Sequence, residues 1–406
     1  MVSVRGSLLM LRLTPELIYY ILRYFVIGSP YRKLKNRFVA TIKMVIYRWG
    51  ISLPIPDGRF ISFLKNKTLI NSVIPLAHKQ ITSKYNNYGK QFDPKSIWIY
   101  EKPDRKPSDP VLIYLHGGGY YIQTAPSQVT GVMAIHQLLD PEKRKNLSIL
   151  LLDYSLACHG FTLPTQLNEL DSSYTELSKG CSNIILMGDS AGGHLALTYS
   201  QKLKLENIPN KPYPSKLVLI SPWVKILPSE SQFTPGNSFY DNDGRDIIQY
   251  YDMNHLKHVV GDNSLNSLLM SPSNKIPQVR SDWNSIPTFA NPDSDIFVLL
   301  GEDEAFRDDI LEWCDYALGV PLRSQHKYGH FGNFFDPKTH SYHREGGSEG
   351  ASVRIYVEPW GVHDSCFFFE DSLFSEIKKK KRTLKDVDQE KYFGLYRVAK
   401  FLNDKL

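Results

Sequence analysis

Short apolar runs, separated by helical stretches, recur along the chain from residue 97 to residue 357. They are continuous rather than alternating in polarity, as in strands buried on both faces of a parallel sheet. Strands that alternate with helices predict an α/β fold. The expected helices include 164–180, which Pro164 opens, and Ala191–Lys204. The expected strands are Ile97–Tyr100, Val111–Leu115, Ile149–Asp153, Ile184–Met187, Leu217–Ile220, Ile296–Leu300 and Val353–Val357.

Two segments interrupt this alternation. Residues 225–291 contain no good strand, and they hold polar turns and helical pieces such as Asp246–Met253. So long an excursion from a sheet predicts a cap or lid. Residues 326–350 are rich in His, Gly and Asp and predict an irregular surface loop.

The clearest chemical motif is Gly188-Asp189-Ser190-Ala191-Gly192-Gly193. It follows an expected strand and opens an expected helix, which is the setting of a nucleophile elbow. A serine on so sharp a turn needs neighbours without bulky side chains. We therefore expect Ser190 to be a catalytic nucleophile.

A second motif, His116-Gly117-Gly118-Gly119-Tyr120, ends the strand Val111–Leu115. Glycines let backbone N–H groups approach a ligand oxygen closely. The N–H groups of Gly117, Gly118 and Gly119, together with that of Ala191, are candidates for an oxyanion hole. The alternative is a tight turn without a catalytic role.

An acid and a histidine follow the last two expected parallel strands. The acidic block 302–309 comes after Ile296–Leu300, and His363 comes shortly after Val353–Val357. The chain order serine, acid, histidine is that of α/β-hydrolases. His363 would accept the proton of Ser190, and the acid would hold the imidazole tautomer. Competing histidines, which do not directly follow a strand, are His326, His330, His340 and His343.

Two further motifs accompany the elbow and the glycine block, namely Ser221-Pro222-Trp223 and Arg307-Asp308. Together the four motifs, over roughly residues 95–400, resemble the hormone-sensitive-lipase-like carboxylesterases. The resemblance implies an α/β-hydrolase fold with a mostly parallel central sheet flanked by helices. It also implies a cap, formed by the N-terminal arm and an inserted segment, and ester hydrolysis without a cofactor.

Within that family the chain is most similar to the fungal steryl acetyl hydrolase branch. The similarity rests on Tyr120-Tyr121-Ile122-Gln123-Thr124, on the block that begins at Gly301, and on a basic, apolar N-terminus. The branch implies an enzyme of the endoplasmic reticulum membrane that removes acetyl groups from sterol esters. Where the family has an aspartate, this chain has Glu304, so Glu304 is the expected triad acid. Asp303, one residue earlier, is the alternative.

Residues 1–60 form an arm that we expect to be distinct from the hydrolase domain at 90–406, whose cap insertion lies at about 225–291. The first fifty residues hold nine Lys or Arg and one acid, Glu16, a net charge of +8 in a chain of net +6. The apolar stretches Leu17–Gly28 and Phe38–Trp49 are too short and too charged to span a bilayer. They predict amphipathic helices that either lie on a membrane surface or pack on the body.

These observations favour a serine esterase that acts on short-acyl esters of hydrophobic alcohols, with sterol or steroid acetates as the expected substrates. One alternative is a non-catalytic protein that binds a lipophilic ligand on the same fold, as in relatives that have lost the histidine. Another is an arylacetamide-type amidase. No nucleic-acid-binding motif and no H-E-x-x-H metal motif is present. Four widely spaced cysteines without a C-x-x-C pair exclude a zinc finger and a disulfide scaffold.

Overall fold

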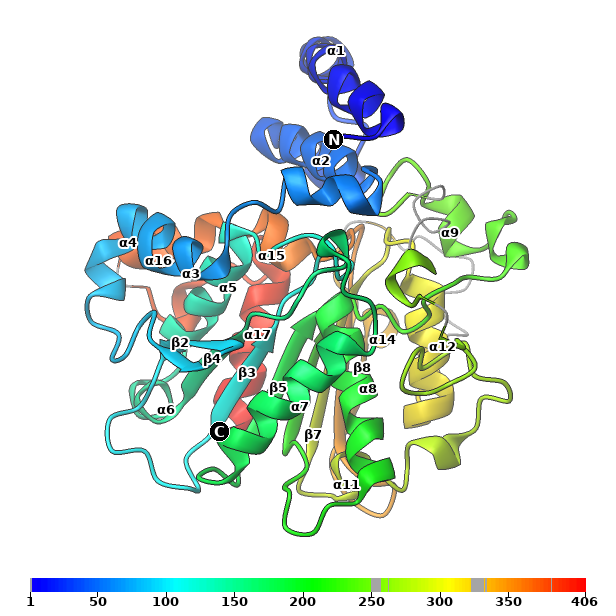
Figure 1. Ribbon diagram of the computed structural model, residues 1–406. Coiled ribbons are helices and arrows are strands. Elements are labelled where there is room, and N and C mark those ends of the chain that lie inside the picture. Colours follow the sequence, from blue (N-terminus) through cyan, green and yellow to red (C-terminus); the bar gives the residue numbers. More distant parts are fainter. Residues whose placement is uncertain (1, 250–256, 262, 323–331, 333, 381) are drawn as a thin grey trace.

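The computed structural model describes residues 2–249, 257–261, 263–322, 332, 334–380 and 382–406 (Figure 1). Helices and strands alternate through most of it. The strands are β1 (Gln91–Asp93), β2 (Ser96–Tyr100), β3 (Val111–Leu115), β4 (Ser148–Leu152), β5 (Ile184–Asp189), β6 (Lys216–Ile220), β7 (Asp295–Gly301), β8 (Ser341–Arg344) and β9 (Ser352–Glu358). The helices before β5 are α1 (Val4–Ile27), α2 (Phe38–Ile51), α3 (Asn66–Thr68), α4 (Ile74–Thr82), α5 (Pro126–Gln137), α6 (Pro141–Asn146) and α7 (Thr165–Ser178). Those after it are α8 (Ala191–Glu206), α9 (Ser238–Asp241), α11 (Pro287–Ala290), α12 (Arg307–Leu318), α14 (Pro337–His340), α15 (Ser365–Phe369), α16 (Ser372–Lys380) and α17 (Phe393–Lys405).

The strands of the described residues form one sheet in the order β1-β2-β4-β3-β5-β6-β7-β9-β8. From β4 to β9 neighbouring strands are parallel, whereas β1 with β2, β2 with β4, and β8 with β9 are antiparallel. This is the mostly parallel mixed sheet expected of an α/β-hydrolase. All seven strands expected from apolar runs are present.

Both faces of the sheet are buried, which explains the continuous apolar runs. Along β3, Val111, Ile113 and Leu115 face one core, and Leu112 and Tyr114 face the other. The first core is covered by α7, α8, α11 and α12, and the second by α4, α5, α15, α16 and α17. The sheet is therefore sandwiched between two helical layers.

Two sequence expectations were wrong in part. Within 326–350, residues 337–344 are ordered as α14 and as β8, which pairs with β9, because an antiparallel edge strand needs no long apolar run. His326 and His330 lie outside the described residues. The expected helix Asp246–Met253 does not begin at Asp246: residues 246–249 are non-helical, with the N–H of Ile247 donating to Asp246 Oδ1, and residues 250–253 lie outside the described residues.

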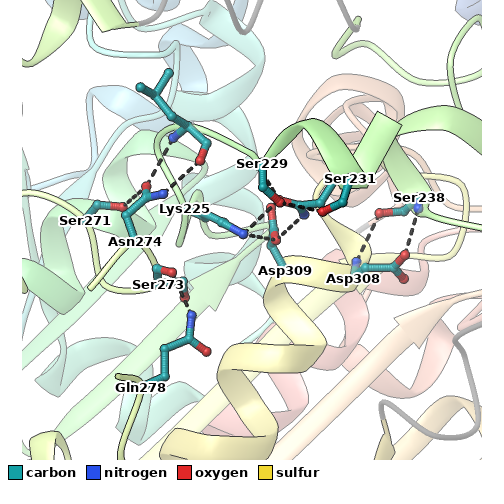
Figure 2. A network of polar contacts seen from close by, with 12 residues as sticks. Lys225, Ser229, Ser231, Ser238, Ser271, Ser273, Asn274, Gln278, Asp308 and Asp309 are labelled. Carbon is teal, nitrogen blue, oxygen red and sulfur yellow. Dashed lines mark hydrogen bonds and ion pairs between the residues drawn. The ribbon is translucent and has the colours of Figure 1, made fainter. Parts of the chain in front are cut away.

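The inserted segment is fastened to α12 by polar contacts (Figure 2). Lys225 Nζ lies 3.8 Å from Asp309 Oδ1, and Gln232 Nε2 donates to the same oxygen at 2.6 Å. At the preceding residue, the backbone N–H of Ser238 donates to Asp308 Oδ2, and the N–H of Asp308 donates to Ser238 Oγ. The segment is thus held against the start of α12 by the last two residues of the acidic block.

The N-terminal arm lies above the body, with α1 outermost and α2 beneath it (Figure 1). Several of its basic side chains contact the body. Arg32 forms an ion pair with Asp303, Lys33 lies 3.1 Å from Glu358, and Lys43 lies 2.6 Å from Asp371. Three of the nine basic side chains in the first fifty residues thus pair with acids of the body.

Apolar side chains instead cover the outer side of α1. The members that are more than half exposed are Val4, Leu8, Leu11, Ile18, Tyr19, Leu22, Phe25, Val26 and Ile27. Within the described part of the chain, no helix reaches the length and apolar character that crossing a membrane requires. The four cysteines are buried and unpaired.

Candidate active site

Ser190 sits on the turn between β5 and α8, as the elbow motif predicts. Its backbone has φ = 50° and ψ = −114°, a strained conformation for a non-glycine residue. The N–H of Ser190 donates to Ile220 O at 2.9 Å, which helps to hold the turn. A Cβ at Gly192 would lie 1.8 Å from Leu115 O, so only glycine permits the helix to approach β3 this closely.

His363 follows β9 and lies beside the serine, although 173 residues separate the two in the chain. Its Nε2 is 2.9 Å from Ser190 Oγ. The imidazole is 2% exposed and packs edge-on against the ring of Phe306. The serine and the histidine are therefore within hydrogen-bond distance in a water-poor environment.

The Glu304 carboxylate stands on the other side of the imidazole. Its Oε1 lies 3.5 Å from His363 Nδ1, and neither atom has a closer polar partner among the described residues. Its Oε2 accepts hydrogen bonds from Ser221 Oγ and from the N–H of Gly301, both at 2.7 Å. Glu304 is thus fixed with one oxygen aimed at the imidazole, and such contacts are often long in unliganded enzymes.

Asp303, the alternative acid, points elsewhere. Its Oδ2 accepts from Arg32 Nε at 2.9 Å, and its backbone N–H donates to Gly361 O. The structure therefore brings Glu304, and not Asp303, to the histidine. His340 and His343 lie on α14 and β8, and neither contacts Ser190 in the described structure.

Sequence reasoning missed two buried carboxylates next to His363. Asp364 Oδ2 is 3.3 Å from His363 Nε2, and Asp246 accepts the backbone N–H of His363 at 2.8 Å. Asp364 was visible as the next residue, but nothing in the sequence ties Asp246 to a site 117 residues away. Burial lowers the pKa of His363, but the negative charges of Asp364, Glu304 and Asp246 outweigh it and raise the pKa above its ordinary value.

The glycine turn after β3 forms another wall of the site. Gly117, Gly118 and Gly119 line the same pocket as Ser190 and His363, and Ala191 begins α8 immediately after the serine. Gly118 has φ = 111° and Gly119 has φ = 59°. Gly117 packs against Asp189, whose Oδ2 would lie 2.4 Å from a Cβ added at Gly117, and its backbone N–H lowers the pKa of that carboxylate. The candidate donors toward a bound oxygen are therefore the N–H groups of Gly118, Gly119 and Ala191.

Asp189 anchors this turn from below. Its carboxylate also accepts from Tyr114 Oη and Gln128 Nε2, each at 2.6 Å. Burial raises the pKa of Asp189 to about 6, against the opposing effect of these hydrogen bonds. Asp189 of the elbow is thus a buried carboxylate that β3 and α5 hold in place next to the glycine turn.

The pocket above Ser190 has a volume of about 110 Å³. It is lined by Tyr47 and Ile51 of α2, by Ile247 and Ile248 of the inserted segment, and by aromatic side chains of the body. Tyr47 closes one side, with its ring centroid 4.6 Å from that of Phe368. No group of three or more His, Cys, Asp or Glu suited to holding a metal ion occurs within the described ranges.

Comparisons with known proteins agree with this geometry. The sequence matches the steryl acetyl hydrolase family over residues 35–330. A Schizosaccharomyces pombe protein described as a candidate steryl acetyl hydrolase is 31% identical over 306 residues, which cover 71% of this chain and 78% of the relative. The chain belongs to the steryl acetyl hydrolase family. It is a carboxylic ester hydrolase, as the sequence motifs predict.

More distant similarities extend to a second steryl acetyl hydrolase and to solved structures of esterases. Steryl acetyl hydrolase 1 of Saccharomyces cerevisiae is 27% identical over 41% of this chain and 37% of its own length. A bacterial hormone-sensitive-lipase-family esterase has a TM-score of 0.54 at 18% identity, covering 90% of this chain and 97% of its own. Esterases from Rhizomucor miehei give a TM-score of 0.52 at 16% identity, covering 76% and 78%. These structures share the α/β-hydrolase fold.

Proposed function

We propose that this steryl acetyl hydrolase family member is a serine esterase that removes acetyl groups from esters of apolar alcohols, sterol acetates among them. The observation that carries the proposal is the 2.9 Å contact between Ser190 Oγ and His363 Nε2, beside a glycine turn in an apolar pocket. The proposed triad is Ser190, His363 and Glu304. It uses no cofactor.

The reaction follows from these positions. Ser190 Oγ attacks the acyl carbon while its proton passes to His363 Nε2, and the carbonyl oxygen accepts from the N–H groups of Gly118, Gly119 and Ala191. The imidazolium then protonates the departing alcohol oxygen as the acyl–oxygen bond breaks. Water, deprotonated by the same nitrogen, attacks the acetyl-serine, and the imidazolium returns that proton to Ser190 Oγ as acetate leaves. Glu304 orients the imidazole and stabilises its positive charge.

The size of the pocket favours a short acyl group. Binding sites for drug-sized ligands enclose about 300 Å³ or more, whereas this pocket holds about 110 Å³. An acetyl group and the first atoms of the alcohol fill that volume. The remainder of a sterol would then lie between Tyr47 of α2 and Ile247 and Ile248 of the inserted segment, which offer an apolar surface.

A serine-directed fluorophosphonate tests the nucleophile. We expect stoichiometric labelling, with the added mass on the peptide that contains Ser190 and none in Ser190→Ala. Ser200→Ala is the matched control, because Ser200 is a buried serine of α8 whose hydroxyl donates to the backbone carbonyl of Ala196. Absence of labelling in folded wild-type protein would instead favour the non-catalytic, ligand-binding alternative.

We further propose that the outer face of α1 rests on a membrane surface, that of the endoplasmic reticulum. The support is the row of exposed apolar side chains, which an aqueous setting disfavours when they are contiguous. Liposome flotation should therefore recover wild-type protein but not the Leu22→Glu, Phe25→Glu double variant. Leu205→Glu, at an exposed leucine on α8, should float like wild type. Equal recovery of all three would refute this placement.

A further inference from the structure

Asp246 is a fully buried carboxylate that lies in the inserted segment rather than in the α/β core. It is 0% exposed, and its two oxygens accept three backbone N–H groups. Oδ1 accepts from Ile247 at 2.7 Å and from His363 at 2.8 Å, and Oδ2 accepts from Ala305 at 2.8 Å. A carboxylate held in this way is fixed in position at both of its oxygens.

The two distant donors belong to the loops that carry the proposed acid and base. Ala305 follows Glu304 directly, and His363 is the base itself. One side chain from the insert therefore bridges the loop after β7 to the loop after β9. We propose that Asp246 is a positioning residue that sets the spacing of Glu304 and His363 and couples the inserted segment to the triad. This inference rests on the function proposed above.

The neighbours of Asp246 extend the connection to the substrate pocket and to the arm. Ile247 and Ile248, next in the chain, line the pocket. Arg48 of α2 donates to the backbone carbonyl of Asp246, and Gln249 Nε2 donates to Arg48 O at 3.0 Å. A bound alcohol that displaces Ile247 and Ile248 would therefore also shift Asp246, which contacts both the loop of Glu304 and the loop of His363.

The negative charge of Asp246 also affects the pH dependence of activity, which a purely structural role would leave unchanged. His363 and Glu304 are the titratable groups that face it, Arg48 contacts its carbonyl, and Asp364 and Asp189 act on the same imidazole. The negative charge of Asp246 favours the imidazolium. Replacing it with a neutral amide therefore lowers the pKa of His363. Because the unprotonated imidazole is the base, the acid limb of activity moves to lower pH.

The test compares Asp246→Asn with wild type and with Asp243→Asn, a matched control at an exposed aspartate three residues upstream. On p-nitrophenyl acetate, kcat should fall about 10- to 100-fold, the loss expected from a misplacement of about 1 Å at reacting groups. The acid limb of kcat/KM should move to lower pH, and fluorophosphonate labelling of Ser190 should slow by the same factor as kcat. Asp243→Asn should match wild type throughout.

A folded Asp246→Asn variant with wild-type kcat and an unchanged acid limb would overturn the inference about Asp246. The proposed function would still stand if wild-type activity depends on Ser190. Wild-type protein without Ser190-dependent activity would instead remove the proposed function. If Asp246→Asn does not fold, Arg48→Gln decides the matter, because half-buried Arg48 donates to the carbonyl of Asp246 and the substitution leaves the Asp246 carboxylate in place. A fall in kcat at unchanged melting temperature supports the coupling, and an unchanged kcat overturns it.

Discussion

Gly118→Ala should disable the proposed oxyanion hole while leaving the fold intact. At Gly118, φ is +111°, and an added Cβ would lie 2.5 Å from Ile122 O. Ordinary carbon contacts need about 3.5 Å, so the turn must shift by about 1 Å. The N–H groups of Gly118 and Gly119 shift with it. Loss of one oxyanion donor costs about 10²- to 10³-fold in kcat, or roughly 2.7–4 kcal/mol in the barrier.

Gly160→Ala is the control for backbone strain. Gly160 has φ = +90°, and nothing lies within 4 Å of its added Cβ. It should lose about 1–2 kcal/mol of stability from the left-handed backbone and keep wild-type kcat. The assay is kcat on p-nitrophenyl acetate, with the melting temperature of each variant measured in parallel. A folded Gly118→Ala enzyme with kcat within threefold of wild type would refute the role assigned to this turn.

Three more predictions concern the triad and the pocket. Surrounding carboxylates raise the pKa of His363, so the acid limb of kcat/KM should lie above pH 6.5, the ordinary pKa of histidine. An acid limb below pH 6.5 in the pH profile would contradict the role of His363 as the base. Glu304→Gln should lower kcat by up to about 10⁴-fold, because the acid no longer fixes the imidazole tautomer. Asp303→Asn should lower kcat far less. If Asp303→Asn has the larger effect, Asp303 is the triad acid. Tyr47→Ala should raise kcat/KM for p-nitrophenyl butyrate relative to acetate by at least about tenfold, the lower limit for one methylene in an apolar pocket. Tyr19→Ala, on the outer face of α1, should leave this ratio unchanged.

The fold was predictable where burial imposes a pattern. The strands from β2 to β7, and β9, are buried over most of their length, so each is largely apolar, although Arg354 interrupts β9. The edge strands β1 and β8 escaped prediction because their residues are half-exposed and carry no such run. The N-terminal helices were predicted from their apolar spacing, but the partners of their charges were not, because the acids that pair with them are hundreds of residues away in the chain.

The site residues that lie at the ends of predicted strands could also be predicted. Ser190, the glycine turn and His363 follow strand ends, and the carboxyl ends of parallel strands meet at one edge of a sheet. Local spacing could not separate Glu304 from Asp303, since adjacent residues on a loop point in different directions. Nor could it find Asp246, whose importance arises only when the inserted segment folds over the loops of the acid and the base.

The most direct test of the central claim is hydrolysis by detergent-solubilised protein of p-nitrophenyl acetate and of a sterol acetate, with Ser190→Ala beside the wild type. We predict that the wild type cleaves both esters and that Ser190→Ala cleaves neither above background. Cleavage of the small ester alone would remove the sterol from the proposal. A folded wild type that cleaves neither ester would contradict the account of Ser190, His363 and Glu304 as a working triad.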